Sequence, residues 1–473
     1  MIFRGETTST PTHFGNHPTA YRCRGSAPVV NPPPFDACGK QRRTRLRPHP
    51  AGAVFLALWL LLGFFGCSEE TPRLTFWVGG APQEVDYWES LVDVYERRSG
   101  TQVDVIRQPA ATEQRKQGLV IALESRQPDP DVFLMDIIWI TQFVRSGWLE
   151  SLDGYFQRGT LQPVEFFEPV IESVDRHDGR YYALPAFLDV GVLYYRSDLL
   201  DRHDFSGPPA TWDVLLQQSL AIQSVERERN PNFNGFVWQG AQYEGLVCTF
   251  LEFVATHGGG ILRDGTVDLQ QDGNLAALQF MQGLIQDHRI SPLNTYTEMQ
   301  EEEVRRTFQR GNALFERNWL YAWSLHQQPG SKVRGKIGMA PLPHATGHRT
   351  AAALGGWHLG ISKTSDVKDR AWNLVAYLLS REVQKKLLMT LGWYSCRKDV
   401  YTDPEVLQNV GNVEQLQQIV AQAVHRPDLA YYDSVSRVIQ RYVNDCLSGK
   451  LEPRKALAAM QEKIEQIERT YGR

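Results

Sequence analysis

Three polar side chains stand where predicted strands end or where predicted helices begin. Glu84 follows a β-rich segment, residues 74–78, and a glycine turn. Asp136 ends a continuous apolar strand, and Arg115 starts the second helix, where it is a natural partner for either acid. Ligands of open α/β sheets sit beyond the carboxyl ends of the strands. A carboxylate there can accept hydrogen bonds from two hydroxyl groups, so the pattern predicts a site for a polar ligand.

Each of these side chains also has a purely structural interpretation. Glu84 fits a helix N-terminus, where the helix dipole favours an acid. Asp136 fits the cap of the helix that follows it, and Arg115 fits a solvated helix charge. A carboxylate that leaves an apolar strand is costly to bury unless it has partners. The sequence by itself leaves both interpretations open.

The elements around these residues alternate between strand and helix, which predicts a parallel α/β arrangement. We expect strands at residues 74–78, 103–108 and 131–136, and helices at 84–100 and 115–128. The β-rich segment 181–200 contains Pro185, where a crossing between two lobes is expected. Residues 211–325 read as mostly helical, strands follow at 335–343 and 355–362, and amphipathic helices follow at 366–379, 382–391 and 453–471.

Composition and charge exclude one class of partner. The chain has 473 residues with 50 basic and 54 acidic side chains, and the first 66 residues carry eight basic and two acidic ones. Residues 67–473 therefore carry 42 basic and 52 acidic side chains, a net charge of −10. Nucleic-acid binding needs a basic surface, so nucleic acid is not expected as a partner.

The N-terminal region reads as an export signal. A basic stretch at residues 40–47 precedes an apolar run at residues 51–66, which is shorter than the ~20 residues of a spanning helix. Gly66-Cys67 resembles the lipobox of bacterial lipoproteins, in which the cysteine becomes the lipidated first residue. The alternative is an uncleaved N-terminal anchor helix. Both interpretations export the rest of the chain, while the true start of the chain stays open.

The cysteines do not form a metal-binding pattern. Cys248, Cys396 and Cys446 follow Cys67, and no CxxC spacing occurs, so no zinc site is expected. In an oxidising compartment, Cys396 and Cys446 either form a disulfide or stay buried as free thiols. The sequence does not distinguish between these two states.

A series of motifs in a fixed order resembles one protein family. The chain contains PDVFLMD, GWLESL, YALPAFLDVGVLYYRSDLL, PATWDVLL, FNGFVWQGAQYEGLVCTFLE, LFERNWLYAW, MAPLP, GGWHLGIS and HRPDLAYYDSVSRVIQ. This order is similar to the family 1 extracellular solute-binding proteins of ABC importers, the maltose-binding-protein type, and most of all to its trehalose/maltose-binding branch. The resemblance covers residues 72–473.

The resemblance implies the α/β, two-lobed periplasmic binding protein fold of type II. Each lobe is a mainly parallel sheet flanked by helices, and a hinge joins the lobes. Residues 72–185 with 358–400 would form lobe one, and residues 186–357 with 401–473 would form lobe two. Residues 1–66 would be an N-terminal extension with the lipoprotein signal. The ligand would sit in the cleft between the lobes.

The resemblance also implies which residues hold the ligand. A sugar offers hydroxyl groups to planar polar side chains and C–H faces to aromatic rings. Core packing is the alternative for each tryptophan. Phe187 departs from the branch, which often has an aromatic hydroxyl there, so the exact sugar stays open. The ligand-binding residues carried over are Glu84, Arg115, Asp136, Asp189, Tyr243, Trp319, Gly356, Trp357 and Arg426.

The function implied is capture, without catalysis, cofactor or metal. A monomeric lipoprotein outside the cytoplasm would bind an α-linked disaccharide such as trehalose or maltose and deliver it to an ABC permease. The alternatives are another cargo, namely a glycerol phosphodiester, a polyamine or ferric iron, and a secreted glycoside hydrolase. The pairs Tyr194-Tyr195 and Tyr431-Tyr432 raise the iron alternative, for which core packing is the competing explanation. The sequence names neither the sugar nor the permease, nor which membrane carries the anchor.

Overall fold

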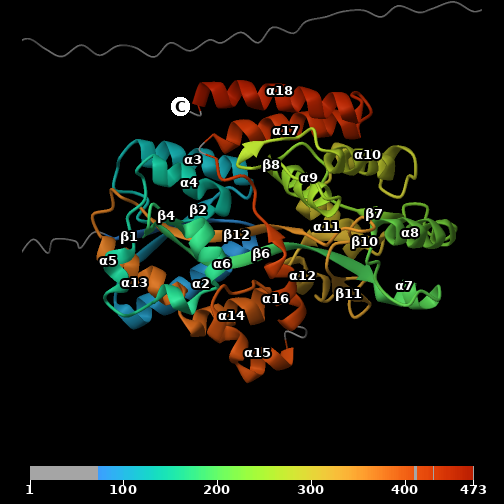
Figure 1. The fold of residues 1–473 in the computed structure, drawn as a ribbon. Coiled ribbons are helices and arrows are strands. Elements are labelled where there is room, and N and C mark those ends of the chain that lie inside the picture. Colours follow the sequence, from blue (N-terminus) through green and yellow to red (C-terminus); the bar gives the residue numbers. More distant parts are fainter. Residues whose placement is uncertain (1–72, 410–412, 430, 472–473) are drawn as a thin grey trace, which may run out of the picture. The chain divides into compact units, whose positions relative to one another are not determined.

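The computed structural model describes residues 73–409, 413–429 and 431–471, so the predicted signal and Cys67 lie outside it. One sheet organises this part of the chain, with the strand order β2-β1-β3-β12-β6-β10-β7 (Figure 1). Strand β11 also pairs with β6, and β13 pairs with β12. We call β2, β1, β3 and their helices the β1 side, and β7, β10, β11 and helices α8 to α12 the β10 side.

The β1 side is parallel, as its alternation predicts. β1 (Leu74–Gly79) pairs in parallel with β2 (Val103–Gln108) and β3 (Val132–Asp136). Helix α2 (Pro82–Ser99) starts with Pro82 in its first turn and ends at Gly100, whose φ of 71° suits glycine. Its apolar stripe is buried as the spacing predicts, with Trp88, Leu91, Val92 and Tyr95 inside. Helix α3 (Thr112–Glu124) packs Leu119 and Leu123 into a second core beside β3.

The β10 side combines one parallel and two antiparallel pairings. β10 (Ala313–Trp319) runs parallel to β7 (Asn234–Val237) and antiparallel to β6, and β11 (Ile337–Ala340) is antiparallel to β6. Helices accompany these strands, as the mostly helical pattern of residues 211–325 predicts. They are α8 (Trp212–Glu226), α9 (Glu244–Thr256), α10 (Asp272–Gln286), α11 (Glu301–Gln309) and α12 (Ala322–His326).

Two long strands belong to both sides. β6 (Ala183–Arg196) and β12 (Ala352–Ile361) are antiparallel to each other; β12 also pairs with β3, and β6 also pairs with β10. A bulge interrupts their ladder, because Trp357 faces Phe187 while His358 faces Pro185. Ala186 is therefore the extra residue, and its carbonyl accepts a hydrogen bond from the buried Gln384 amide at 2.9 Å.

Helices follow β12 to the C-terminus. α17 (Tyr432–Leu447) and α18 (Pro453–Tyr471), red in Figure 1, lie side by side, and α17 packs on α9 and α10. The segment between β12 and α17 contains α13 (Lys368–Leu378), α14 (Arg381–Leu391), η5 (Lys398–Thr402), α15 (Pro404–Asn409), α16 (Val413–Ala421) and β13 (Ala423–Val424). Among the described residues, no helix is both long and apolar enough to cross a membrane.

Short elements complete the connections. The β1 side continues through η1 (Ile137–Trp139), α4 (Ile140–Arg145), α5 (Asp153–Phe156), η2 (Pro163–Glu165), α6 (Glu168–Val170), the π-helical η3 (Ile171–Asp175), β4 (Arg176–His177) and β5 (Arg180–Tyr181). The remaining elements are α7 (Ser197–Arg202), β8 (Leu262–Arg263), β9 (Thr266–Val267) and η4 (Leu293–Tyr296).

Candidate functional site

Glu84 lies at the start of α2 and accepts a hydrogen bond from the backbone N–H of Ala81 at 2.7 Å. This bond confirms the structural interpretation, because the acid caps the helix N-terminus. Burial nevertheless raises the pKa of Glu84, while Arg115 acts in the opposite direction. A desolvated carboxylate with one satisfied oxygen retains hydrogen-bonding capacity for a ligand.

Arg115 is not a solvated helix charge, because only 6% of it is exposed. Its guanidinium donates to the Gly79 carbonyl at 2.8 Å and lies 4.0 Å from the centre of the Trp357 ring. Burial lowers the pKa of Arg115 to about 10, and Glu84 and Asp136 oppose this effect. The side chain therefore fixes one face of a half-buried tryptophan.

Asp136 both caps the next helix and joins a buried ion pair. Its Oδ1 accepts from the Ile138 N–H at 3.1 Å and from Arg426 at 3.2 Å. The other arm of Arg426 donates to Glu244 at 3.1 Å. Burial is the main cause of the raised pKa of Glu244, which also accepts from Tyr432 and Ser436, at 2.5 Å each. Both terminal nitrogens of Arg426 thus donate hydrogen bonds to carboxylates of the protein.

Trp319 ends β10, and its indole N–H donates to Glu301 at 3.4 Å. The Arg317 guanidinium lies 4.1 Å from the Trp319 ring centre and forms a fully buried pair with Glu252, at 2.5 and 2.7 Å. The Tyr243 hydroxyl is buried, and the described residues provide it with no hydrogen-bond partner at ordinary geometry. Burial and the charge of Glu301 raise the pKa of Tyr243 well above its usual value.

Asp189 and Gly356 lie on the two strands that the sides share. Asp189 accepts from the N–H groups of Leu320 and Val190, at 2.8 and 3.0 Å, and burial raises the pKa of Asp189 to about 7. Gly356 has a φ of +143°, and a Cβ there would lie 2.8 Å from the Phe187 carbonyl oxygen, so only glycine fits. The Phe187 ring stacks on Trp393, with centroids 4.2 Å apart.

Charges from both sides act on the same groups. The carboxylate of Glu302, on α11 of the β10 side, contributes to the raised pKa of Glu84, and Glu84 in turn contributes to the raised pKa values of Asp189 and Tyr321. The structure therefore brings predicted residues of the β1 side close to β6 and α11. Sequence reasoning missed Glu301, Glu302 and Tyr321, although an acidic run at residues 301–303 opens α11.

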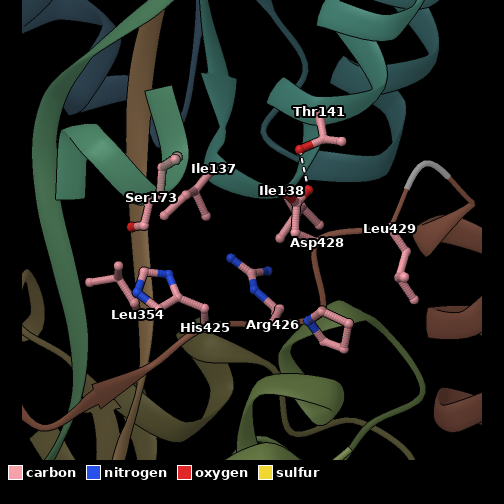
Figure 2. A pocket seen from close by; sticks show the side chains of 11 residues that line it. Ile137, Ile138, Thr141, Ser173, Leu354, His425, Arg426, Asp428 and Leu429 are labelled. Carbon is pink, nitrogen blue, oxygen red and sulfur yellow. Dashed lines mark hydrogen bonds between the residues drawn. The ribbon is translucent and has the colours of Figure 1, made fainter. Parts of the chain in front are cut away.

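A pocket of about 70 Å³ lies beside the Asp136–Arg426 pair (Figure 2). It is lined by Ile137, Ile138, Thr141, Ser173, Val174, Leu354, His425, Arg426, Pro427, Asp428 and Leu429. Figure 2 shows the Arg426 side chain pointing among the lining groups from the segment between β13 and α17. Its buried Nε lacks a hydrogen-bond partner among the described residues.

Other residues raised by the sequence have structural roles. Cys248, Cys396 and Cys446 are all buried free thiols, so the described structure contains no bond between the last two. Tyr194 is buried and donates to the Trp319 carbonyl at 2.9 Å, as expected for packing. Trp238 is also core, bonded to Ser291. Within the described ranges, no group of three or more His, Cys, Asp or Glu side chains is arranged to hold a metal.

Residues 81–385 match the family of bacterial extracellular solute-binding proteins. A probable ABC transporter-binding protein of Deinococcus radiodurans is 32% identical over 417 residues, which span 87% of this chain and 97% of the relative. An arabinooligosaccharide-binding protein of Halalkalibacterium halodurans is 25% identical over 422 residues, 84% of this chain and 90% of the relative. The solved structure of maltose-bound T. maritima MalE3 is 36% identical with a TM-score of 0.77, over 84% of this chain and 99% of that one.

This chain belongs to the bacterial extracellular solute-binding protein family. The family expected from the motifs is confirmed, and so is the two-lobed α/β fold. The division into lobes at particular residues and the nine ligand-binding residues stay predictions.

Proposed function

We propose that this chain is the sugar-binding lipoprotein of an ABC importer. It captures an α-linked disaccharide such as maltose or trehalose between two lobes, residues 72–185 with 358–400 and residues 186–357 with 401–473. It acts as a monomer outside the cytoplasm, anchored at Cys67, and presents the loaded form to the permease. The maltose-bound T. maritima relative and the arabinooligosaccharide-binding relative support a saccharide ligand.

One observation carries the proposal. Two half-buried tryptophans each have an arginine over the ring: Arg115 of α3 lies 4.0 Å from the centre of Trp357 on the shared strand β12, and Arg317 lies 4.1 Å from that of Trp319 on β10. An arginine holds an indole ring at a fixed angle. Flat apolar faces next to carboxylates suit the C–H face and the hydroxyl groups of a sugar. Asp136 pairs with Trp357 across β3 and β12, and Glu301 accepts a hydrogen bond from the Trp319 indole N–H, so each ring has a carboxylate beside it.

The mechanism requires no bond chemistry. Carboxylates and guanidinium groups hold the hydroxyls, and a sugar that touches both lobes selects the closed arrangement. Hydrogen bonds to charged groups contribute about 1.5–3 kcal/mol each, so several of them suffice for micromolar affinity.

The direct test is a thermal-shift panel of maltose, trehalose, sucrose and maltotriose, with glycerophosphocholine, spermidine and ferric iron as competing cargoes. A bound ligand raises stability by RT ln(1 + [L]/Kd). We expect a saccharide to raise the melting temperature. A shift with only the other cargoes would overturn the proposal, as would release of monosaccharides during incubation.

Calorimetry of two variants with the same sugar locates the site. We expect Trp357→Ala to weaken binding about tenfold or more, because a stacking face is lost. Trp148→Ala is the matched control, because Trp148 is also half-buried against the core beside β3, with its ring centre 5.3 Å from that of Phe143, and is not one of the nine predicted ligand residues. Equal affinities in the two variants would refute the assigned stacking role.

Anchoring is tested separately from binding. We expect the chain expressed in its native host to fractionate with membranes and the Cys67→Ser variant to be released. Release of both proteins, or of neither, would contradict lipidation at Cys67.

A further inference from the structure

Three side chains near the C-terminus, Arg426, Asp428 and Asp433, bond to the β1 side; we call them the C-terminal bridge. Arg426 donates to Asp136 at 3.2 Å, and Asp428 accepts from the Thr141 hydroxyl. Asp433, in the first turn of α17, accepts from the Lys116 ammonium group with both oxygens, at 2.5 and 2.6 Å. Figure 2 shows the Asp428–Thr141 bond at the edge of the pocket.

These bonds connect elements that pack on different halves of the sheet. Lys116 lies on α3 and Thr141 on α4, both of which contribute to the core beside β3. Asp433 lies on α17, which packs on α9 and α10 of the β10 side (Figure 1). The bridge therefore joins the two sides by polar contacts between protein groups alone.

Burial separates the Lys116–Asp433 pair from ordinary surface pairs. Only 13% of the Lys116 side chain is exposed, against 39% for Asp433. Exposed pairs contribute little because water and salt screen them, and partial burial with two short bonds strengthens the attraction. Lys116 is neither a predicted ligand contact nor part of the pocket lining.

We propose that Lys116 and Asp433, assisted by Thr141 and Asp428, are positioning residues that favour the arrangement of the two sides described here before any ligand binds. The pair raises the population of this arrangement, and the population of the arrangement that binds the ligand scales the apparent affinity. The effect on affinity rests on the proposed function, whereas the effect on the ligand-free molecule does not.

The primary experiment measures the ligand-free full-length chain by electron–electron distance spectroscopy. Nitroxide labels go on Ile121→Cys and Leu293→Cys, which are 70% and 65% exposed and lie on α3 and η4. Cys23, Cys38 and Cys67 are replaced by serine, and the three buried thiols stay in place. We expect Lys116→Met to shift the distance distribution away from that of the parent protein. An unchanged distribution would overturn the proposal.

Two further variants separate this contact from general loss of charge. Lys363→Met removes another lysine–carboxylate pair, with Glu150 at 3.1 Å, in which the lysine is 55% exposed. Its two members lie side by side where residue Leu149 bridges Ser362 after β12, so the pair does not join the two sides. This control is expected to keep the parental distribution. Lys116→Asp alone is expected to shift it most, and Lys116→Asp with Asp433→Lys to restore it. A shift in the control equal to that of Lys116→Met, or a failure of the exchanged pair to restore the distances, would contradict the bridge.

A maltose titration then measures the consequence for binding. We expect Lys116→Met to weaken maltose affinity about three- to tenfold, with the control unchanged. Shifted distances with unchanged affinity would disprove the affinity effect. If maltose bound to neither the parent protein nor any variant, maltose would be the wrong ligand under the proposed function. The distances measured without ligand would still show whether the C-terminal bridge positions the two sides.

Discussion

Two arginines each stack on a tryptophan in this molecule, and the protein holds them in different ways. Arg115, which lies over Trp357, donates to a backbone carbonyl and forms no ion pair within 4.0 Å among the described residues. Arg317, which lies over Trp319, forms a two-bond pair with the Glu252 carboxylate, and both side chains are 1% exposed. A guanidinium group stacks on each tryptophan ring, but only the Arg317 guanidinium forms an ion pair with a carboxylate among the described residues.

The presence or absence of an ion pair predicts how strongly the loss of each arginine destabilises the fold. Removing a cation that pairs with a buried carboxylate leaves that carboxylate uncompensated, which is strongly unfavourable. Removing Arg115, whose hydrogen-bond acceptors are the neutral Gly79 carbonyl and Thr112 hydroxyl, leaves no carboxylate without a directly bonded cation, although Glu84 and Asp136 lose a nearby positive charge. We therefore expect the loss of Arg317 to affect mainly the stability of the fold. The loss of Arg115 should affect stability less, so that its effect on ligand binding can be measured.

The largest effect is expected from Arg317→Met. The stranded Glu252 carboxylate should lower the free energy of unfolding by about 3–5 kcal/mol, read from the midpoint of urea denaturation. Adding Glu252→Gln removes the charge and keeps an acceptor for the Ala353 N–H, so the double variant should regain part of the loss. A double variant less stable than the single one would contradict this account.

Arg115→Met is expected to have a smaller effect on stability. Loss of the two hydrogen bonds from the guanidinium, to the Gly79 carbonyl and the Thr112 hydroxyl, and of the stacking contact should cost about 1–2 kcal/mol in the same urea measurement. Sugar affinity should fall as well, since the Trp357 ring loses the group that fixes it. If Arg115→Met lowered the free energy of unfolding as much as Arg317→Met, the ion pair would not distinguish the two arginines.

The smallest effect on stability is expected from Glu84→Gln. The amide oxygen can still accept from the Ala81 N–H, so the cap survives and unfolding should change by less than about 0.5 kcal/mol. Glu84→Ala, which removes the cap, should cost about 1 kcal/mol. Calorimetry with sugar gives the second readout, and unchanged affinity in Glu84→Gln would leave Glu84 with its capping role alone.

Local patterns allowed much of the β1 side to be predicted. The strand expected at residues 103–108 is β2 to the residue, and the helix expected at 453–471 is α18. Glu84 and Asp136 lie at the strand and helix ends that the sequence indicates, and both also make the capping bonds of the structural interpretation. Periodicity and caps involve residues a few positions apart, and the sequence displays such patterns directly.

Long-range pairing could not be predicted in the same way. Glu252 and Arg317 are 65 residues apart, and Asp136 and Arg426 are 290 apart, so no local spacing announces either pair. The motifs predict Arg426 as a ligand contact, which stays a prediction, and they do not indicate that both its terminal nitrogens bond to Asp136 and Glu244. The ring of Phe187, which has no hydroxyl, stacks on Trp393, a partner that only the fold reveals.

The extra residue in β6, Ala186, decides where this strand can change in length. Side chains alternate between the two faces of a strand, so deleting a residue from a regular stretch turns over every side chain on one side of the deletion. Loss of Ala186 would instead make Pro185 and Phe187 neighbours opposite His358 and Trp357, which keeps the pairing on both sides, removes the bulge and takes away one of the two acceptors of the Gln384 amide. Descendants of this sequence can therefore lose a residue from β6 at the bulge far more easily than elsewhere along its pairing with β12.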